Sequence, residues 1–257
     1  MDQARWHQAI INPAALDVHV VQEIHPDDGM LGGDLPYYQS VGRDAARLVS
    51  TALLQAQRAR GGSTTTPARI LDFACGYGRV GRYLRACFPD ADIAFSDLAS
   101  EASAFCARAF SGRQVPVDEE FTGYAPGAPC DLIWVGSLFT HLRPGKSARL
   151  FDLLYGLLAP GGLLVMTMCG RYVAARRDKA TSLYNLDLGD YDAMVEQARD
   201  EGYGFAPYAR SPDYGLSVAL PRWWQEQAAR HAASEVVYFS ERGWIRHQDV
   251  VAILRTS

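Results

Sequence analysis

The sequence predicts an α/β protein built on a mostly parallel sheet that ends in an antiparallel strand. Short apolar runs of about five residues alternate with helical patterns between residues 70 and 168, which is typical of parallel strands joined by crossover helices. Two further strand patterns near the C-terminus, 235–240 and 248–254, are joined by only a few residues. Such a link is too short for a crossover, so these two strands must be antiparallel. Helices should cover both faces of the sheet.

The individual elements follow from apolar spacing and from Gly and Pro positions. Besides the final hairpin, strands are expected at 70–73, 93–97, 114–117, 131–136 and 163–168, with a possible strand at 215–220. Helices are expected at 38–60, 79–88, 100–110, 145–158, 191–201 and 221–233. The third strand contains a proline, which indicates a strand end or an edge position.

The chain divides into an N-terminal part and one larger domain. Residues 1–62 are expected to be an irregular arm followed by a lead-in helix, and residues 63–257 to form the main domain. Residues 171–214 are polar and interrupt the strand–helix alternation, so we expect them to be a cap insertion.

Composition narrows the class of protein. The 257 residues carry 25 Lys and Arg against 29 Asp and Glu, a net charge of −4, so no basic excess is available for nucleic acid. No apolar run reaches the roughly 18 residues needed to span a bilayer, so no membrane contact is expected. The N-terminus lacks a signal-peptide pattern, which predicts a cytoplasmic location. Five cysteines without a C-x-x-C pair favour neither a disulfide framework nor a zinc site. The oligomeric state stays open.

A glycine loop follows the first predicted strand and marks a binding site for a small molecule. Gly76, Gly78 and Gly81 form the pattern G-x-G-x-x-G, and Asp97 ends the second strand about 20 residues later. This pattern satisfies the fingerprint of a dinucleotide-binding loop, so an NAD(P)-dependent oxidoreductase is one alternative. Two features oppose it: Asp72 lies inside the first strand, and the array ends in an antiparallel pair instead of a second mononucleotide-binding half.

A wider set of motifs supports another interpretation of the glycine loop. These are residues 71–78, Asp97, the segments 130–141 and 158–165, and the final hairpin. Together they resemble the class I S-adenosylmethionine-dependent methyltransferases, over about residues 69–255. Residues 137–142 and 243–249 are similar to bacterial small-molecule methyltransferases, including some from glycan pathways.

The resemblance implies a Rossmann-like, seven-stranded, mostly parallel sheet and S-adenosylmethionine as the cofactor. It further implies methyl transfer to a small-molecule or glycan acceptor, with oxygen as the expected atom. The sequence shows no acid triplet like that of the metal-dependent relatives, so no metal is expected.

The resemblance also assigns the cofactor contacts. Expected cofactor-binding residues are Asp72, Ala74, Gly76, Gly78, Asp97, Leu98 and Ser137. Asp72 is expected to meet the methionyl ammonium and Asp97 the ribose hydroxyls, because hydrogen bonds to charged acceptors are strong. The N–H groups of the loop and the following helix are expected to meet the methionyl carboxylate.

Two histidines are candidates for a catalytic base. His141 follows the fourth strand, and His247 lies in the final hairpin at the same edge of the sheet. A hydroxyl acceptor needs a base near neutral pH, for which histidine is suited. Either histidine could instead hold local backbone, which leaves a non-catalytic S-adenosylmethionine-binding protein as a second alternative. Residues 118–120 either contact the adenine amine or form a solvated acidic loop.

Overall fold

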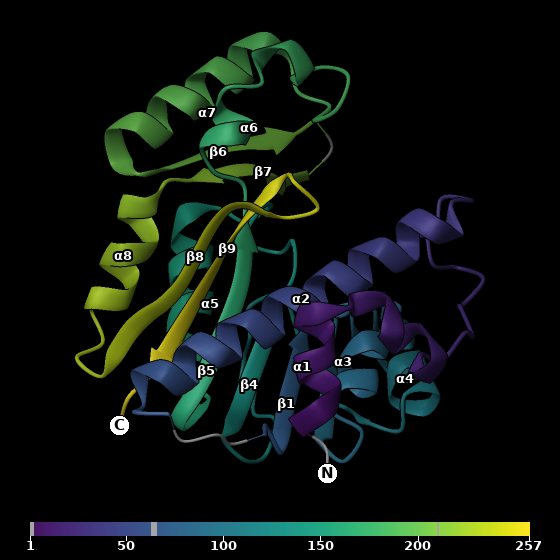
Figure 1. The fold of residues 1–257 in the computed structure, drawn as a ribbon. Helices are drawn as coiled ribbons and strands as arrows, with labels where there is room; N and C mark the ends of the chain where they lie inside the picture. Colours follow the sequence, from purple (N-terminus) through teal and green to yellow (C-terminus); the bar gives the residue numbers. More distant parts are fainter. Residues whose placement is uncertain (1–2, 63–65, 210) are drawn as a thin grey trace.

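The computed structural model describes residues 3–62, 66–209 and 211–257, and its centre is a seven-stranded sheet in the order β3-β2-β1-β4-β5-β9-β8 (Figure 1). The strands are β1 (Arg69–Phe73), β2 (Asp92–Ser96), β3 (Arg113–Gln114), β4 (Cys130–Val135), β5 (Leu158–Met168), β8 (Ser234–Trp244) and β9 (Gln248–Arg255). Strands β1 to β5 are parallel, and β9 is antiparallel to both β5 and β8. The predicted mostly parallel sheet with an antiparallel last strand is therefore confirmed.

Successive residues of the central strands pack into two separate hydrophobic cores. Ile70 packs on the α2 side of the sheet, whereas its neighbour Leu71 packs on the α5 side. The same alternation separates Leu132 from Ile133. Because adjacent side chains of a strand point to opposite faces, an unbroken apolar run is what a strand buried on both faces requires.

Helices cover both faces, as predicted. Those packed on one core are α1 (Gln3–Ile11), α2 (Leu35–Ala59), α3 (Gly81–Cys87) and α4 (Ser100–Ala109), and those on the other are α5 (Pro144–Gly156) and α8 (Pro221–Ala229). The first helix and the short 3₁₀ helix η1 (Pro13–His19) correct the expectation of an irregular arm. Trp6 and Leu16 are fully buried, so tertiary packing stabilises segments that show little periodicity.

A second layer lies above the carboxyl ends of the parallel strands (Figure 1). It follows β5 and consists of α6 (Arg171–Ala174), η2 (Arg177–Lys179), α7 (Leu188–Glu201) and an antiparallel pair, β6 (Tyr203–Tyr208) with β7 (Ser211–Ala219). We call residues 171–219 the cap; it has an apolar core of its own. Strand β6 was not expected, because Gly204 and Pro207 interrupt its sequence pattern.

Several predicted boundaries differ from the structure. Strand β3 ends before Pro116, which lacks the N–H that a ladder needs. Strand β7 crosses the predicted end of the cap at residue 214, and the predicted start of the main domain, residue 63, lies outside the described residues. None of the described helices is long and apolar enough to cross a membrane. The cytoplasmic location stays a prediction.

The contact between α2 and α3 offers a test of the packing. A Cβ added at Gly42 would lie 2.3 Å from the backbone oxygen of Arg79 and 2.4 Å from Cδ2 of Tyr83. Because the backbone cannot easily yield, Gly42→Ala should lower the free energy of unfolding by about 2–4 kcal/mol in urea titrations. The control is Gly156→Ala in α5, where an added Cβ meets nothing within 4 Å. Equal stability of the two variants would contradict the packing.

Candidate functional site

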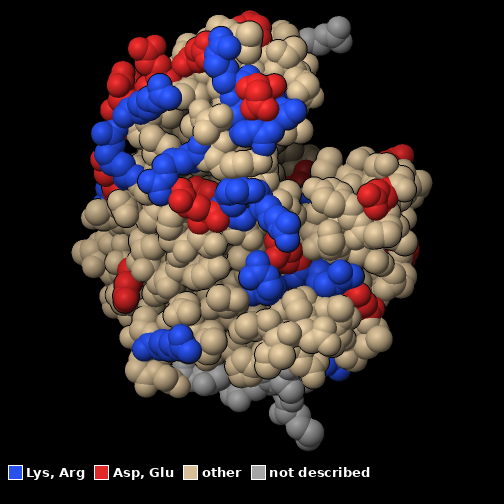
Figure 2. Space-filling view, turned by 45° about the horizontal axis from the view of Figure 1, so that its top comes forward, with Lys and Arg blue, Asp and Glu red and all other residues tan. Residues whose placement is uncertain are grey.

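A cavity of about 660 Å³ lies where the parallel strands end. Its wall comes from the ends of β1, β2 and β4 and the loops that follow them, from the arm at Asp28 and Met30, and from residues 211–214 of the cap. The space-filling view shows a hollow between the cap and the rest of the chain (Figure 2). Ligands of open parallel sheets bind beyond the carboxyl ends of the strands, so this cavity is the candidate site.

The cavity brings together most of the residues predicted to hold a cofactor. Those that line it are Asp72, Ala74, Gly76, Asp97, Leu98 and Ser137. Gly78 is not part of the lining: a Cβ there would lie 2.2 Å from Phe110 and 2.9 Å from Sγ of Cys106. The structure therefore gives Gly78 a packing role against α4, whereas Gly76 (φ 52°) has nothing within 4 Å of an added Cβ and faces open space.

Asp72 carries a buried carboxylate without a counter-charge. Its residue is 1% exposed, and within the described part of the chain its Oδ2 has no hydrogen-bond partner. Burial, together with the charge of Asp97, raises the pKa of Asp72 well above its usual range. Buried polar groups are nearly always paired, so this oxygen marks a place for a positively charged or donating ligand group.

Asp97 fixes the glycine loop as well as facing the cavity. One carboxylate oxygen accepts a hydrogen bond from the backbone N–H of Gly76 at 2.8 Å, and the other accepts from the N–H of Ala99 at 2.9 Å. Each carboxylate oxygen can accept more than one bond. Asp97 is thus able to shape the loop and to receive ligand hydroxyls.

Strained backbone gathers at the cavity. Three lining residues other than glycine, Ala74, Phe121 and Ser137, have left-handed φ angles of 58°, 60° and 65°. A network across three strand ends supports Ser137: its N–H donates to Oγ1 of Thr167 at 2.7 Å, and its hydroxyl accepts from Nε2 of Gln248 at 2.7 Å. Such strain, held by surrounding hydrogen bonds, is characteristic of functional sites.

The structure adds one cation that the sequence analysis missed. Arg79 lines the cavity, and its side chain has no hydrogen bond or ion pair with any described residue. Burial lowers its pKa. The nearby Asp28 is already engaged, because its carboxylate accepts from the hydroxyl of Tyr38 at 2.6 Å and from the N–H of Met30 at 3.0 Å. The only sequence signal was a basic residue directly after the second glycine.

His141 lies in the cavity wall, and the cap holds it there. Its Nδ1 lies 2.8 Å from the carbonyl oxygen of Gly215, and its ring stacks on Tyr214 with centroids 4.6 Å apart. A carbonyl only accepts, so Nδ1 carries the proton and Nε2 keeps its lone pair. Burial lowers the pKa of His141, partly offset by this hydrogen bond, so the ring is neutral near pH 7. This arrangement suits a base.

The structure does not bring His247 to the cavity. It is absent from the lining and packs against Tyr172 and Tyr184, with centroid distances of 5.6 and 5.9 Å. Burial and the charges of Arg176 and Arg242 lower its pKa. Of the two sequence candidates, only His141 lies where a ligand could meet it.

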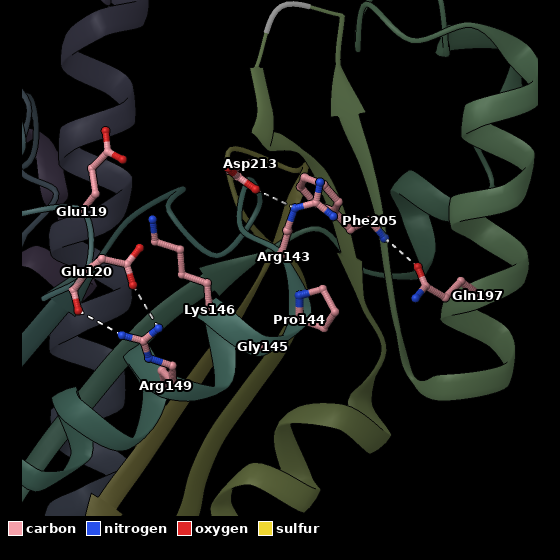
Figure 3. A pocket seen from close by; sticks show the side chains of 10 residues that line it. All are labelled: Glu119, Glu120, Arg143, Pro144, Gly145, Lys146, Arg149, Gln197, Phe205 and Asp213. Carbon is pink, nitrogen blue, oxygen red and sulfur yellow. Dashed lines mark hydrogen bonds and ion pairs between the residues drawn. The ribbon is translucent and has the colours of Figure 1, made fainter.

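The three acids after β3 separate into different roles. Asp118 accepts from the N–H groups of Glu120 and Thr122 and stabilises its own turn. Glu119 lines the cavity, whereas Glu120 lines only a neighbouring cleft of about 520 Å³ between α5 and the cap (Figure 3). Of these acids, Glu119 alone is placed to meet a ligand in the cavity.

The central part of the chain is similar to known methyltransferases. Residues 71–164 match a sequence family described as a methyltransferase domain. A trans-aconitate 2-methyltransferase from Methylobacterium radiotolerans is 32% identical over 126 residues, which are 49% of this chain and 44% of that protein. The chain thus covers less than half of that relative.

Solved structures share the fold at low sequence identity. An S-adenosylmethionine-dependent methyltransferase from Clostridium acetobutylicum matches 90% of this chain and 96% of its own, with a TM-score of 0.54 and 12% identity. The plantazolicin methyltransferase BamL was solved with a triazolic desmethylPZN analogue and SAH. Its match covers 100% of this chain and 100% of BamL, with a TM-score of 0.54 and 10% identity. These matches confirm the predicted Rossmann-like fold.

The unpaired carboxylate of Asp72 predicts a pH-dependent stability. Because its pKa is raised, the folded chain keeps a proton that the unfolded chain loses above about pH 4, so the free energy of unfolding falls as pH rises through the folded-state pKa. Asp72→Asn should therefore add about 1–3 kcal/mol at pH 8 and almost nothing at pH 4. Urea titrations at both values measure this, and a difference that does not change with pH would contradict it.

Proposed function

We propose that the chain transfers a methyl group from S-adenosylmethionine to oxygen of a small-molecule or glycan acceptor, because residues 71–164 match a methyltransferase domain and the fold is shared with an S-adenosylmethionine-dependent methyltransferase. The observation that carries the proposal is the pair of unpaired charges in the cavity, Asp72 and Arg79. The methionyl end of S-adenosylmethionine is a zwitterion, with one ammonium and one carboxylate. At the glycine loop and the strand before it, the cavity offers an unpaired group of each opposite sign.

The ammonium, the carboxylate and the ribose hydroxyls of the cofactor each have a candidate partner. Asp72 would bind the ammonium and Arg79 the carboxylate, while Asp97 would accept from the ribose hydroxyls. Two of the loop N–H groups expected to meet the carboxylate, those of Gly76 and Gly78, donate instead to Asp97 and to the carbonyl of Cys75. The guanidinium of Arg79 would supply positive charge to the carboxylate in place of these two N–H groups.

The overall charge of the cavity also favours a cationic ligand. Its lining acids are Asp28, Asp72, Asp97, Glu119 and Asp213, and its lining cations are Arg79 and Lys146. A sulfonium centre is stabilised by such an excess of carboxylates.

The chain's own part in the reaction is to position the acceptor and remove its proton. S-adenosylmethionine supplies a methyl group on positively charged sulfur, open to in-line displacement. As the acceptor oxygen forms its bond to the methyl carbon and the sulfur–methyl bond breaks, Nε2 of His141 would take the hydroxyl proton. The hydrogen bond from Nδ1 to Gly215 keeps the ring in the tautomer that can do so.

Neither alternative function is favoured. The sheet ends in the antiparallel pair β9 and β8 where a dinucleotide-binding fold would repeat its parallel half. A purely cofactor-binding protein leaves unexplained why the cavity extends to His141 with a free ring nitrogen. Within the described ranges, no cluster of three or more His, Cys, Asp or Glu is arranged to hold a metal, and a metal-free mechanism stays a prediction.

Cofactor binding is the first test. Calorimetry should show binding of both S-adenosylmethionine and S-adenosylhomocysteine, and Asp97→Ala should weaken it by at least about tenfold, the usual worth of a hydrogen bond to a charged group. The control is Asp200→Ala, which removes an exposed acid from α7 outside the cavity. Absence of binding at millimolar concentration would refute the proposal, and an unchanged dissociation constant in Asp97→Ala would remove Asp97 from the site.

The base is tested by kinetics with an acceptor found by screening pooled metabolites against a labelled methyl donor. His141→Asn keeps a donor for Gly215 but lacks the base, so kcat should fall by about 10²–10⁴ while cofactor affinity is unchanged. Because burial lowers the pKa of His141, wild-type kcat should fall with decreasing pH only below about 6.5, the ordinary histidine value. His247→Ala should leave kcat unchanged. A large loss of kcat in His247→Ala and none in His141→Asn would instead assign the base to His247.

A further inference from the structure

A second cleft, of about 520 Å³, adjoins the cavity on the side of the cap. The first turns of α5, the loop at Glu119 and Glu120, and the cap strands β6 and β7 form its walls (Figure 3). Three residues, Glu119, Lys146 and Asp213, line both the cleft and the cavity, so the two spaces meet there. The cleft is therefore an extension of the proposed site on the side of His141.

One cation at this junction lacks a counter-charge. Arg143 pairs with Asp213 at 3.0 Å, and Arg149 pairs with Glu120 at 3.0 Å. Lys146 has no ion pair with any described residue; its Nζ lies 5.8 Å from the centre of the Phe121 ring. Figure 3 shows its ammonium extending into the space between Glu119 and Asp213, without a bond to either.

The placement of these cations breaks a helix preference. Positive charge is unfavourable near the positive end of the helix dipole, and acids are preferred there. Yet α5 has no acid in its first turn, and Arg143, Lys146 and Arg149 follow each other at three-residue spacing. Arg143 and Arg149 gain an ion pair there, whereas Lys146 does not. A residue that breaks a local rule without a structural gain is expected at a functional site, and the positive charge of Lys146 favours an anion.

The cofactor leaves this cation free. S-adenosylmethionine has a single carboxylate, and Arg79, in the glycine loop, is its proposed partner. An anion at Lys146 must then belong to the other substrate. His141 and Lys146 are five residues apart on one loop and helix, so a single acceptor can meet both.

We propose that the methyl acceptor carries an anionic group, a carboxylate, phosphate or sulfate, and that Lys146 binds this group where the cleft meets the cavity. The inference rests on the proposed function, since it assigns a substrate class to the same site. The cap supplies Gln197, Phe205 and Asp213 to the cleft, so residues outside the matched segment 71–164 would contribute to specificity beside Lys146, which lies within it. The group that accepts the methyl is the hydroxyl facing His141, remote from the anion.

The test compares the two lysines of the chain. Lys146→Gln removes the proposed anion partner, and Lys179→Gln removes a half-exposed lysine of η2 that lies outside both spaces. Calorimetry would titrate citrate, inorganic phosphate and sulfate separately into each protein saturated with S-adenosylhomocysteine. Wild type and Lys179→Gln should bind at least one of these anions at millimolar concentration or better, and Lys146→Gln should bind it about tenfold more weakly. Which anion binds distinguishes carboxylate from phosphate and sulfate.

Turnover gives an independent readout. Hydroxy acids should be methylated in preference to their neutral amides, and Lys146→Gln should raise the KM for the acceptor more than it lowers kcat, because Lys146 binds a remote group. Equal anion affinity in wild type and Lys146→Gln, or a preference for the neutral amides, would overturn the inference while cofactor binding stands. Failure of S-adenosylhomocysteine to bind would overturn the proposed function itself, and the acceptor assignment with it.

Discussion

A carboxylate buried without a partner is the constraint on which the site depends. Asp72 sits in a central strand, with neighbours on both sides that prevent it from turning to solvent. Burying its charge would cost several kcal/mol, so the pKa of Asp72 is raised and the carboxyl keeps a proton more readily, while no described side chain offers it a hydrogen bond at Oδ2. The fold tolerates this cost because the surrounding strands bury apolar side chains on both faces. A cationic ligand would supply the counter-charge that the ligand-free chain lacks.

The cap determines how the second half of the site is arranged. Its strand β7 is hydrogen-bonded to three successive residues of the loop after β4: the N–H of Ser217 donates to Thr140, that of Gly215 donates to His141, and the Ser217 hydroxyl donates to Leu142. These bonds fix the orientation of the base and form one wall of the cleft. The sheet thus holds the donor, and the cap shapes the place of the acceptor.

Much of the sheet could be predicted, because a strand buried on both faces leaves an unmistakable apolar run. The glycine loop and Asp97 could also be predicted, because the backbone conformation of the loop and the hydrogen bonds made by Asp97 restrict the residue types that fit there. For Gly78 the sequence shows that a Cβ is excluded but not what excludes it, and the structure places Phe110 there. Arg79 was missed, because only the folded chain shows which cations remain unpaired.

Other features depended on contacts between distant segments. Helix α1 forms on α2 although its own sequence has little periodicity, and β6 needs β7 beside it. His141 and His247 were both candidates because the sequence places both at the same edge of the sheet. Their difference arises from the cap: it leaves His141 in the cavity wall and surrounds His247 with Tyr172 and Tyr184.

The proton balance of S-adenosylmethionine binding tests this account most directly. Calorimetry at pH 6 in buffers of different ionisation enthalpy counts the protons exchanged on binding. If the ammonium meets Asp72, its positive charge lowers the raised pKa of that group, so wild type should release protons that Asp72→Asn does not. Binding with the same proton exchange in both proteins would show that the buried carboxylate is not the partner of the cofactor.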